Sequence, residues 1–500
     1  MAFASKYQQF WLAGIAIAAT GVLFYFGNGL NPIWPLMWIA PLPVLFFALR
    51  SSWWASAITT TAALLLGNLN MWGYLIKTLG MPVPAWLGIF LTASIAFAAA
   101  VLLFRLLVLR GATWSSLISL PAMWVTIEYL RNLTTPHGSA GSFAYSQLKF
   151  LPFLQLASLT GPWGMSFVLL LFPAALTITW NLYSTSPKQA MRVAFTGCGA
   201  VAAVLIFGTI RLVDHPTQMV KVGLITSDLK ENATVTGPGA DTERLFRDYG
   251  NEARKLAAAG AKAIVIPEKM GVAITGKDAA TDAVLQSIAN ETSTTIVAGV
   301  VSVDGGVKYN EARIYQPLLA VEKYDKEHML PPFESNLKPG TTLMTLSRTN
   351  LASGRTSGQA LNQAPSETWG VAISKDMDFA SPARLYGQSG VGMMLVPGWD
   401  FFVDGSWHGH ISIMRGVEDG FSVVRAAKGG SVFVSDNRGR ILGEVSSSSA
   451  PFATLLVDVP TEHSWTLYQA FGDWFAWISM ALLALALSQM PRVRGIAKER

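Results

Sequence analysis

Cysteine is nearly absent from this 500-residue chain, and charged residues are scarce. Cys198 is the only cysteine, so an intrachain disulfide and a zinc site built on several thiolates are both excluded. Only 14% of the residues are charged, and the formal net charge is +6. The basic residues are not gathered into the patch that marks a nucleic-acid-binding protein. We therefore expect no nucleic-acid partner.

Nucleotide and metal motifs are also missing. The chain has no P-loop, no G-x-G-x-x-G after a predicted strand and no H-E-x-x-H. The sequence therefore predicts neither a metal ion nor an organic cofactor.

Apolar residues, in contrast, are abundant. They make up 51% of the chain, and the mean hydropathy of +0.38 is far above that of an average soluble domain. A helix that crosses a bilayer needs roughly 20 mostly apolar residues. The sequence predicts eight such helices, at residues 8–27, 32–49, 54–76, 83–109, 113–131, 163–183, 191–211 and 472–489.

The distribution of Lys and Arg predicts how these spans are oriented. If the spans alternate in direction, Lys6, Arg50, Arg110, Lys188 and the basic tail "PRVRGIAKER" all fall on one side. Positive loops mark the cytoplasmic side. We therefore expect a multi-pass membrane protein with both termini in the cytoplasm. The predicted organisation is seven transmembrane helices in residues 1–211, an extracytoplasmic domain at 212–471, and a last helix with its tail at 472–500.

The segment 212–471 has the pattern of an α/β domain. Short β-rich runs such as "VKVGLIT" and "TTIVAGVVSV" alternate with helical stretches such as "DTERLFRDYGNEARKLAAAG". The run "GGSVFVSDNRGRILGEV" predicts a hairpin with its turn at residues 436–439, and so a mixed sheet. The polar stretch at 347–367 lacks periodicity, which predicts a long loop that could act as a lid.

Three stretches of this domain place reactive groups at the ends of strands. "AIVIPEKM" ends a buried run with Glu268, a candidate general base. "VEKYDKEHMLPPFE" carries Lys326, which could stabilise an oxyanion, and Glu334, which follows a rigid double proline. "WGVAISKDMDFA" presents Ser374 at a strand tip, where backbone amides of the next turn could form an oxyanion hole.

Taken together, these stretches resemble the carbon–nitrogen hydrolase (nitrilase) superfamily, which uses a Glu-Lys-Cys triad in this order. The spans around the domain resemble one membrane-embedded branch of it, the apolipoprotein N-acyltransferase family. Further matching stretches are "AYSQLKFLPFLQLASLTGPWGMSF", "YDKEHMLPPFES", "LVPGWDF" and "RGVEDGFSVVRAA". The resemblance implies a polytopic α-helical membrane protein with an inserted αββα sandwich domain.

Carried over residue by residue, the resemblance makes Glu268 the general base, Lys326 the oxyanion-stabilising lysine and Glu334 the supporting carboxylate. Ser374 stands where the family has its nucleophilic cysteine. A hydroxyl is a weaker nucleophile than a thiol, so we expect Ser374 to impair or disable the reaction. A cysteine-to-serine substitution made to trap substrate, a natural serine enzyme and a natural non-catalytic relative all remain open, and the intact surrounding motifs favour the first.

The reaction that the resemblance implies is acyl transfer through an acyl-enzyme. A phospholipid donates the acyl chain, and the amine of diacylglyceryl-cysteine on an apolipoprotein accepts it. We expect the protein to act as a monomer among membrane lipids. Four apolar residues could line an acyl pocket: Phe333, Trp399, Phe401 and Phe402. Two alternatives stay open, a membrane-tethered amide hydrolase and a non-catalytic protein that binds lipid or lipoprotein.

Overall fold

The computed structural model describes residues 6–214, 216–229, 237–348, 367–405 and 407–489 of the chain, which form two compact units. Unit 1 comprises Met1–Thr135, Ser139–Val213 and Phe471–Arg500, and unit 2 comprises Pro136–Gly138 and Asp214–Ala470. Most of the predicted loop at 347–367 lies outside the described residues, so its proposed role as a lid stays a prediction.

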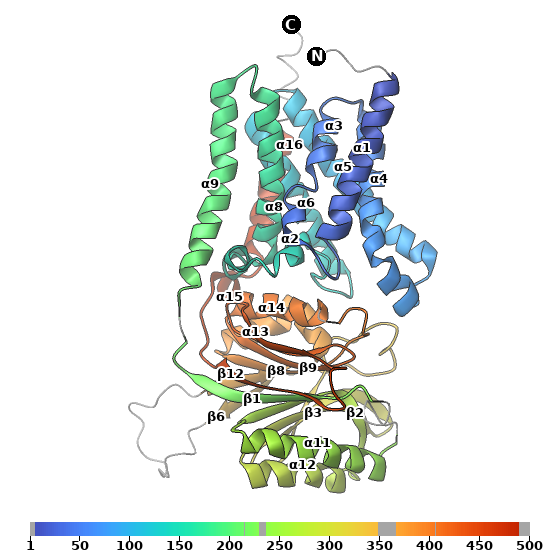
Figure 1. The fold of residues 1–500 in the computed structure, drawn as a ribbon, viewed down its shortest axis with the longest axis vertical. Coiled ribbons are helices and arrows are strands. Elements are labelled where there is room, and N and C mark those ends of the chain that lie inside the picture. The colour runs from blue at the N-terminus through green and yellow to red at the C-terminus, as the bar shows by residue number, and fades with distance from the viewer. Residues whose placement is uncertain (1–5, 215, 230–236, 349–366, 406, 490–500) are drawn as a thin grey trace. The chain divides into compact units, whose positions relative to one another are not determined.

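Unit 1 is helical (Figure 1). Its helices are α1 (Lys6–Gly27), α2 (Trp34–Met37), α3 (Leu42–Ala48), α4 (Trp53–Gly67), η1 (Asn68–Met71), η2 (Gly73–Thr78), α5 (Val83–Leu109), α6 (Thr113–Thr134), η3 (Phe143–Gln147), α7 (Leu151–Leu154), α8 (Ala157–Leu182), α9 (Pro187–Arg211) and α16 (Trp474–Ser488). The first residues of α1 and the last residues of α16 lie at the same end of this unit (Figure 1).

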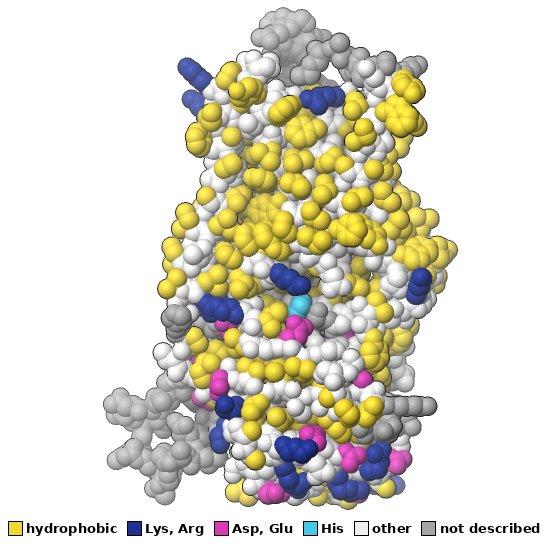
Figure 2. Space-filling model, viewed as in Figure 1, with side chains coloured by type: hydrophobic (Ala, Val, Ile, Leu, Met, Phe, Trp, Pro, Cys, Tyr) yellow, Lys and Arg dark blue, Asp and Glu magenta, His cyan; other side chains and the backbone are white. Residues whose placement is uncertain are grey.

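Four helices of the described residues are long and apolar enough to cross a membrane. They are Tyr7–Gly27, Val83–Leu109, Ala157–Leu182 and Pro187–Arg211. Each overlaps one of the eight predicted spans, and hydrophobic side chains cover much of the surface of unit 1 (Figure 2). A membrane protein is therefore supported, whereas the predicted total of eight spans is not confirmed.

Proline and glycine determine where two of the predicted spans are interrupted or begin. The predicted span 32–49 is split into α2 and α3, because prolines at 35, 41 and 43 interrupt a continuous helix. In α8, Gly161 has a φ of 62° and a ψ of −158°, so the continuous part of that helix begins at Pro162. Proline is favoured at the first helical position, where its missing N–H costs nothing.

Unit 2 contains two six-stranded sheets, as an αββα sandwich requires. The first sheet has the order β12-β1-β2-β3-β4-β5 and the second β11-β10-β9-β8-β7-β6. The strands are β1 (Met219–Thr226), β2 (Ala263–Ile274), β3 (Thr295–Asp304), β4 (Val307–Tyr315), β5 (Glu322–Asp325), β6 (Met344–Arg348), β7 (Glu367–Val371), β8 (Met393–Trp399), β9 (Ser422–Lys428), β10 (Ser431–Ser435), β11 (Ile441–Ser446) and β12 (Ala453–Pro460).

Both sheets are mixed, as the sequence predicts. Strands β1, β2 and β3 run parallel in the first sheet, and β7, β8 and β9 run parallel in the second. Antiparallel strands flank each parallel core. The predicted hairpin is confirmed, because β10 and β11 pair in antiparallel fashion on either side of residues 436–440.

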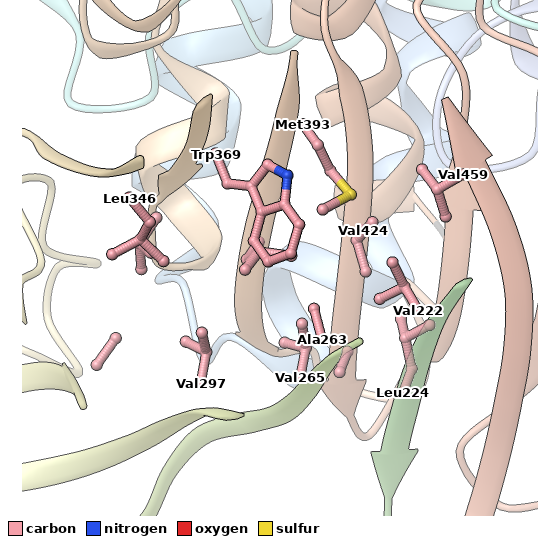
Figure 3. Packing of buried hydrophobic residues seen from close by; sticks show 14 of the residues in the cluster. Val222, Leu224, Ala263, Val265, Val297, Leu346, Trp369, Met393, Val424 and Val459 are labelled. Atoms are coloured by element: carbon pink, nitrogen blue, oxygen red, sulfur yellow. The ribbon is translucent and has the colours of Figure 1, made fainter. Parts of the chain in front are cut away.

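The main core of unit 2 lies between the two sheets. Trp369 and Met393 of the second sheet face Val265 and Val297 of the first, and all four are buried (Figure 3). A second core forms where α11 (Ala240–Ala258) and α12 (Ala279–Thr292) pack on the outer face of the first sheet. The helices α13 (Ala380–Gln388) and α14 (Trp407–Asp419) cover the second sheet (Figure 1). The layers therefore follow the order helix, sheet, sheet, helix.

Candidate active site

Glu268 lies at an irregularity in the middle of β2. The pairing of β2 with β3 shifts register between Ile266 and Gly271, so the residues between them leave the regular ladder. Lys269, the next residue, has a φ of 51°, which lies in the left-handed region that residues other than glycine rarely adopt. The Glu268 side chain turns inward and is only 1% exposed. The irregularity thus places a carboxylate inside the unit.

Gly299 on β3 makes room for this irregularity. A Cβ atom at position 299 would lie 2.5 Å from Cα of Glu268 and 2.6 Å from the carbonyl oxygen of Pro267. No side chain fits in that space without moving backbone.

Lys326 follows β5 directly, and its backbone is fixed on both sides. Its N–H donates to the carbonyl of Asn310 at 2.8 Å, and its own carbonyl accepts from the N–H of Gly340 at 2.8 Å. The side chain is 2% exposed. Nζ donates to Oε1 of Glu268 at 2.9 Å and to Oε2 of Glu334 at 2.8 Å. The three charged residues predicted from the sequence therefore meet in one buried cluster.

Glu334 is the most heavily bonded member of this cluster. Besides Lys326, its carboxylate accepts from Nζ of Lys269 at 2.5 Å, from Nδ2 of Asn310 at 2.7 Å and from the N–H of Leu330 at 2.9 Å. Such a group is held in one orientation, which suits a carboxylate that orients a lysine.

Two members of the cluster were missed in the sequence. Nδ2 of Asn310 donates to Glu268 at 2.5 Å as well as to Glu334, and Asn310 is fully buried in β4. A polar asparagine in a strand was the available signal for it. Lys269 lay in the quoted stretch "AIVIPEKM", but nothing in the sequence indicates that its ammonium turns back toward Glu334.

The charges around Glu268 control its ionisation. Burial alone would raise the pKa of Glu268, but the attraction of Lys326 and Lys269 lowers it to about 2. Burial opposes the charge of Lys326, yet Glu268 and Glu334 raise the pKa of this lysine above its usual value. The cluster therefore holds a carboxylate and an ammonium side by side at neutral pH.

Ser374 opens the short helix η4 (Ser374–Asp378), three residues after β7 ends. Its φ is 42°, again in the left-handed region. Asp376 stabilises this turn, because its Oδ2 accepts from the N–H of Ile373 at 3.0 Å. Oδ1 of the same carboxylate accepts from the N–H groups of Glu327 and His328 at 3.1 and 2.8 Å. Asp376 thus joins the turn at Ser374 to the segment that follows Lys326.

Ser374 and the charged cluster line one cavity of about 220 Å³. Its walls are Glu268, Lys269, Lys326, Leu330, Phe333, Glu334, Ser374, Lys375, Trp399, Phe401 and His408. The three apolar predictions Phe333, Trp399 and Phe401 are among them, and the rings of Phe333 and Phe401 lie 5.2 Å apart. Phe402 is not one of these lining residues, and 67% of it is exposed.

A second polar group borders the cavity next to Ser374. Nζ of Lys375 lies 3.2 Å from Nδ1 of His137 and 3.5 Å from Oδ2 of Asp378. Nε2 of His408 lies 3.2 Å from Oδ2 of Asp404. Burial would lower the pKa of His408, but Asp378 and Asp404 raise it to about 10. His408 therefore lines the cavity and also pairs with two buried carboxylates.

No set of three His, Cys, Asp or Glu side chains is arranged to hold a metal ion in the part of the chain that the structure describes. The chemistry that the cavity can support with its own groups is nucleophilic attack at Ser374, with a carboxylate, an ammonium and backbone amides nearby.

Comparisons with known proteins agree on one family. The sequence model described as "Apolipoprotein N-acyltransferase N-terminal domain" matches residues 20–176. A protein from Geobacter metallireducens named apolipoprotein N-acyltransferase is 26% identical over 507 residues, which cover 95% of each chain. A protein of the same name from Bradyrhizobium diazoefficiens is 27% identical over 444 residues, 80% of this chain and 77% of that protein.

Among solved structures, a variant of a Nesterenkonia amidase from the nitrilase superfamily aligns with 49% of this chain and 94% of its own, at 18% identity and a TM-score of 0.38. The family model and the named relatives confirm the resemblance inferred from the sequence: this chain is similar to proteins named apolipoprotein N-acyltransferase, in one case over 95% of its length.

Proposed function

We propose that this protein transfers an acyl chain from a phospholipid to the N-terminal amine of diacylglyceryl-cysteine in apolipoproteins. One observation carries the proposal. Lys326 donates hydrogen bonds to both Glu268 and Glu334, and these three residues line a cavity that Ser374 also lines. The names of the relatives supply the substrate class.

The first step forms an acyl-enzyme at position 374. The nucleophile attacks the ester carbonyl of the phospholipid, and Glu268 takes its proton. Collapse of the tetrahedral intermediate breaks the bond to the glycerol oxygen, which receives that proton, and lysophospholipid leaves. In the second step the acceptor amine attacks the acyl-enzyme and its proton passes to Glu268. As the amide forms, the bond to the nucleophile breaks, and Glu268 returns the proton to the released nucleophile.

Lys326 stabilises the negative oxygen of both tetrahedral intermediates. An ammonium has three N–H donors, and the contacts to Glu268 and Glu334 use two of them. The third is available to the oxyanion, together with backbone amides of the turn after Ser374. Glu334 fixes the orientation of Lys326 and is not itself a proton carrier in this scheme.

The apolar wall suits a lipid substrate. Phe333 and Trp399 are 47% and 41% exposed beside the charged cluster, so an acyl chain could cover them on binding. The predicted orientation puts this unit on the outer face of the inner membrane, with both termini inside, where both lipid-anchored substrates would be concentrated.

A serine at position 374 weakens the reaction in this scheme. A thiol is a few per cent thiolate at neutral pH, whereas a hydroxyl must lose its proton during the attack. The test is to incubate the protein and its Ser374→Cys form with phospholipid and a diacylated lipopeptide, and to measure acyl addition to the peptide amine by mass spectrometry. We expect rapid addition by the Ser374→Cys form and little by the parent.

Two controls give this test its specificity. Glu268→Gln in the Ser374→Cys form should abolish turnover, and Cys198→Ser should leave it unchanged. Release of free fatty acid without acylated peptide would favour the hydrolase alternative, in which water replaces the amine. Lipopeptide binding without either product in both forms would favour the non-catalytic relative and contradict the proposal.

A further inference from the structure

Lys428 is a buried lysine that the proposed reaction does not use. It is the last residue of β9 in the second sheet and is 2% exposed. Its side chain crosses to the first sheet, where Nζ donates to the carbonyl oxygen of Lys269 at 3.1 Å. Lys269 directly follows Glu268 and has a φ of 51°. Lys428 therefore contacts the backbone at the irregularity that turns Glu268 inward.

Such a conformation needs external restraints. A residue other than glycine in the left-handed region is strained and persists only where its surroundings hold it. Gly299 leaves space for the backbone at this point. Two hydrogen bonds then hold Lys269: its Nζ donates to Glu334, and its carbonyl accepts from Lys428. The second of these bonds comes from the second sheet.

Trp399 connects the same lysine to the apolar wall. Nζ of Lys428 lies 3.8 Å from the centre of the Trp399 ring, and Nζ of Lys269 lies 5.0 Å from it. Trp399 and Lys428 are direct partners in the pairing of β8 with β9. One ammonium group thus contacts both the backbone next to the proposed base and a ring that lines the proposed acyl pocket.

We propose that Lys428 is a positioning residue, which holds the Lys269 turn and the Trp399 ring so that Glu268 and the apolar wall keep their places around the nucleophile. This inference rests on the proposed function, because it assigns Lys428 to the reaction of that site.

The hydrogen bond from Lys428 to the Lys269 carbonyl does not depend on the charge of the lysine. Burial lowers the pKa of Lys428 to about 7, against the attraction of Glu268 and Asp228 and with the repulsion of Lys269. A neutral amine still donates a hydrogen bond to a carbonyl. The restraint on Lys269 is therefore present on both sides of neutral pH.

The test uses the full-length Ser374→Cys form with three substitutions made separately. Lys428→Met removes the donor and keeps the length of the side chain, and Lys428→Arg keeps a donor. Lys338→Met is the matched control, because Nζ of Lys338 also lies over an aromatic ring, 5.8 Å from the centre of Tyr309, but does not line the cavity.

We expect Lys428→Met to lower kcat at least tenfold with KM for the lipopeptide within about threefold, and Lys428→Arg to restore part of kcat. Hydrogen exchange of the peptide that spans residues 266–271 should be at least tenfold faster in Lys428→Met. The Lys338→Met variant should match its parent in both measurements.

Hydrogen exchange separates the two proposals, since it needs no substrate. Fast exchange in Lys428→Met with an inactive Ser374→Cys parent would refute the proposed function, and with it the role of Lys428 in that reaction, while supporting the restraint that Lys428 places on the Lys269 turn. A folded Lys428→Met variant with unchanged kcat and unchanged exchange would overturn the positioning role. If Lys428→Met does not fold, Lys428→Leu, which also lacks a donor, replaces it, and the same two measurements decide.

Discussion

The hydroxyl of Tyr324 donates a hydrogen bond of 2.8 Å to Oδ2 of Asp376. Tyr324 lies in β5, two residues before Lys326, and Asp376 lies two residues after Ser374. Both side chains are buried. The bond therefore links β5 of the first sheet to η4, at the point where the proposed nucleophile and the proposed oxyanion-stabilising lysine must keep a fixed separation.

Loss of the Tyr324 hydroxyl should reduce activity more than an equal loss of stability elsewhere in unit 2 does. We expect Tyr324→Phe to reduce kcat of the Ser374→Cys form several-fold, because the turn at Ser374 and the Lys326 segment lose one connection. The free energy of unfolding should fall by about 2 kcal/mol, as for a hydrogen bond to a charged group. Acyl addition and thermal unfolding in detergent measure the two effects.

Tyr315→Phe is the matched control for this prediction. The Tyr315 hydroxyl donates to Oδ1 of Asp282 at the same distance, 2.8 Å, and Tyr315 is also buried, but neither residue lines the cavity. Its loss of stability should be similar and its kcat unchanged. Equal loss of activity in both variants would show that Tyr324 acts only through stability.

How far the sequence predicts this site depends on the kind of residue. Glu268, Lys326 and Glu334 were predictable because each follows an apolar run or a rigid turn and matches a family motif. Asn310 and Lys269 were not, because their roles depend on register and backbone conformation. Asn310 reaches both carboxylates only through the pairing of β4 with β3 and β5, and nothing in a one-dimensional pattern indicates that pairing.

The same limit applies to the membrane unit. Hydropathy predicted the four helices that are long and apolar enough to cross a membrane. It did not predict that residues 32–49 form two short helices, because a window average does not weigh the prolines that interrupt them. Whether such an apolar segment forms one continuous helix depends on its prolines and local backbone geometry, and not on its apolar content alone.

A substitution at Gly299 should disable the site by displacing the backbone of Glu268. Gly299→Ala would place a methyl group 2.5 Å from Cα of Glu268, so the irregularity in β2 must move. We expect a loss of at least tenfold in kcat of the Ser374→Cys form and a destabilisation of about 1–3 kcal/mol.

Gly88→Ala serves as the control, because Gly88 lies in α5 and a Cβ there would meet no atom within 4 Å. That variant should be at least as stable as its parent, since alanine is the better helix former. Unchanged acyl addition by Gly299→Ala would mean that the position of Glu268 is not critical.

Stability at acidic pH should depend on Glu268. Its folded pKa, about 2, lies below the ordinary value of 4.5, so its stabilising contribution is complete above pH 4.5 and is lost as the pH falls toward 2. The shift corresponds to on the order of 3 kcal/mol. Glu268→Gln should therefore unfold at a lower temperature at pH 7, and the difference from the parent should shrink at pH 3.

The exposed pair of Arg254 and Glu291 provides the comparison, since 56% of the Glu291 side chain is exposed. Glu291→Gln should change the unfolding temperature little at any pH, because surface pairs contribute little. A constant difference between Glu268→Gln and its parent from pH 7 to pH 3 would contradict the assigned shift.

Stability at alkaline pH should depend on His408 in the opposite sense. The folded pKa of His408, about 10, exceeds the ordinary value of 6.5, because Asp378 and Asp404 outweigh the effect of burial. Its contribution is therefore complete below pH 6.5 and is lost as the pH rises toward 10. His408→Gln should be less stable than its parent at pH 6, and the difference should narrow by pH 10. His410 lies two residues further along α14 and is paired with Glu444 at 3.4 Å, so His410→Gln controls for the loss of any histidine on this helix. If the two variants followed the same pH dependence, the ion pair of His408 with Asp404 could not be its cause.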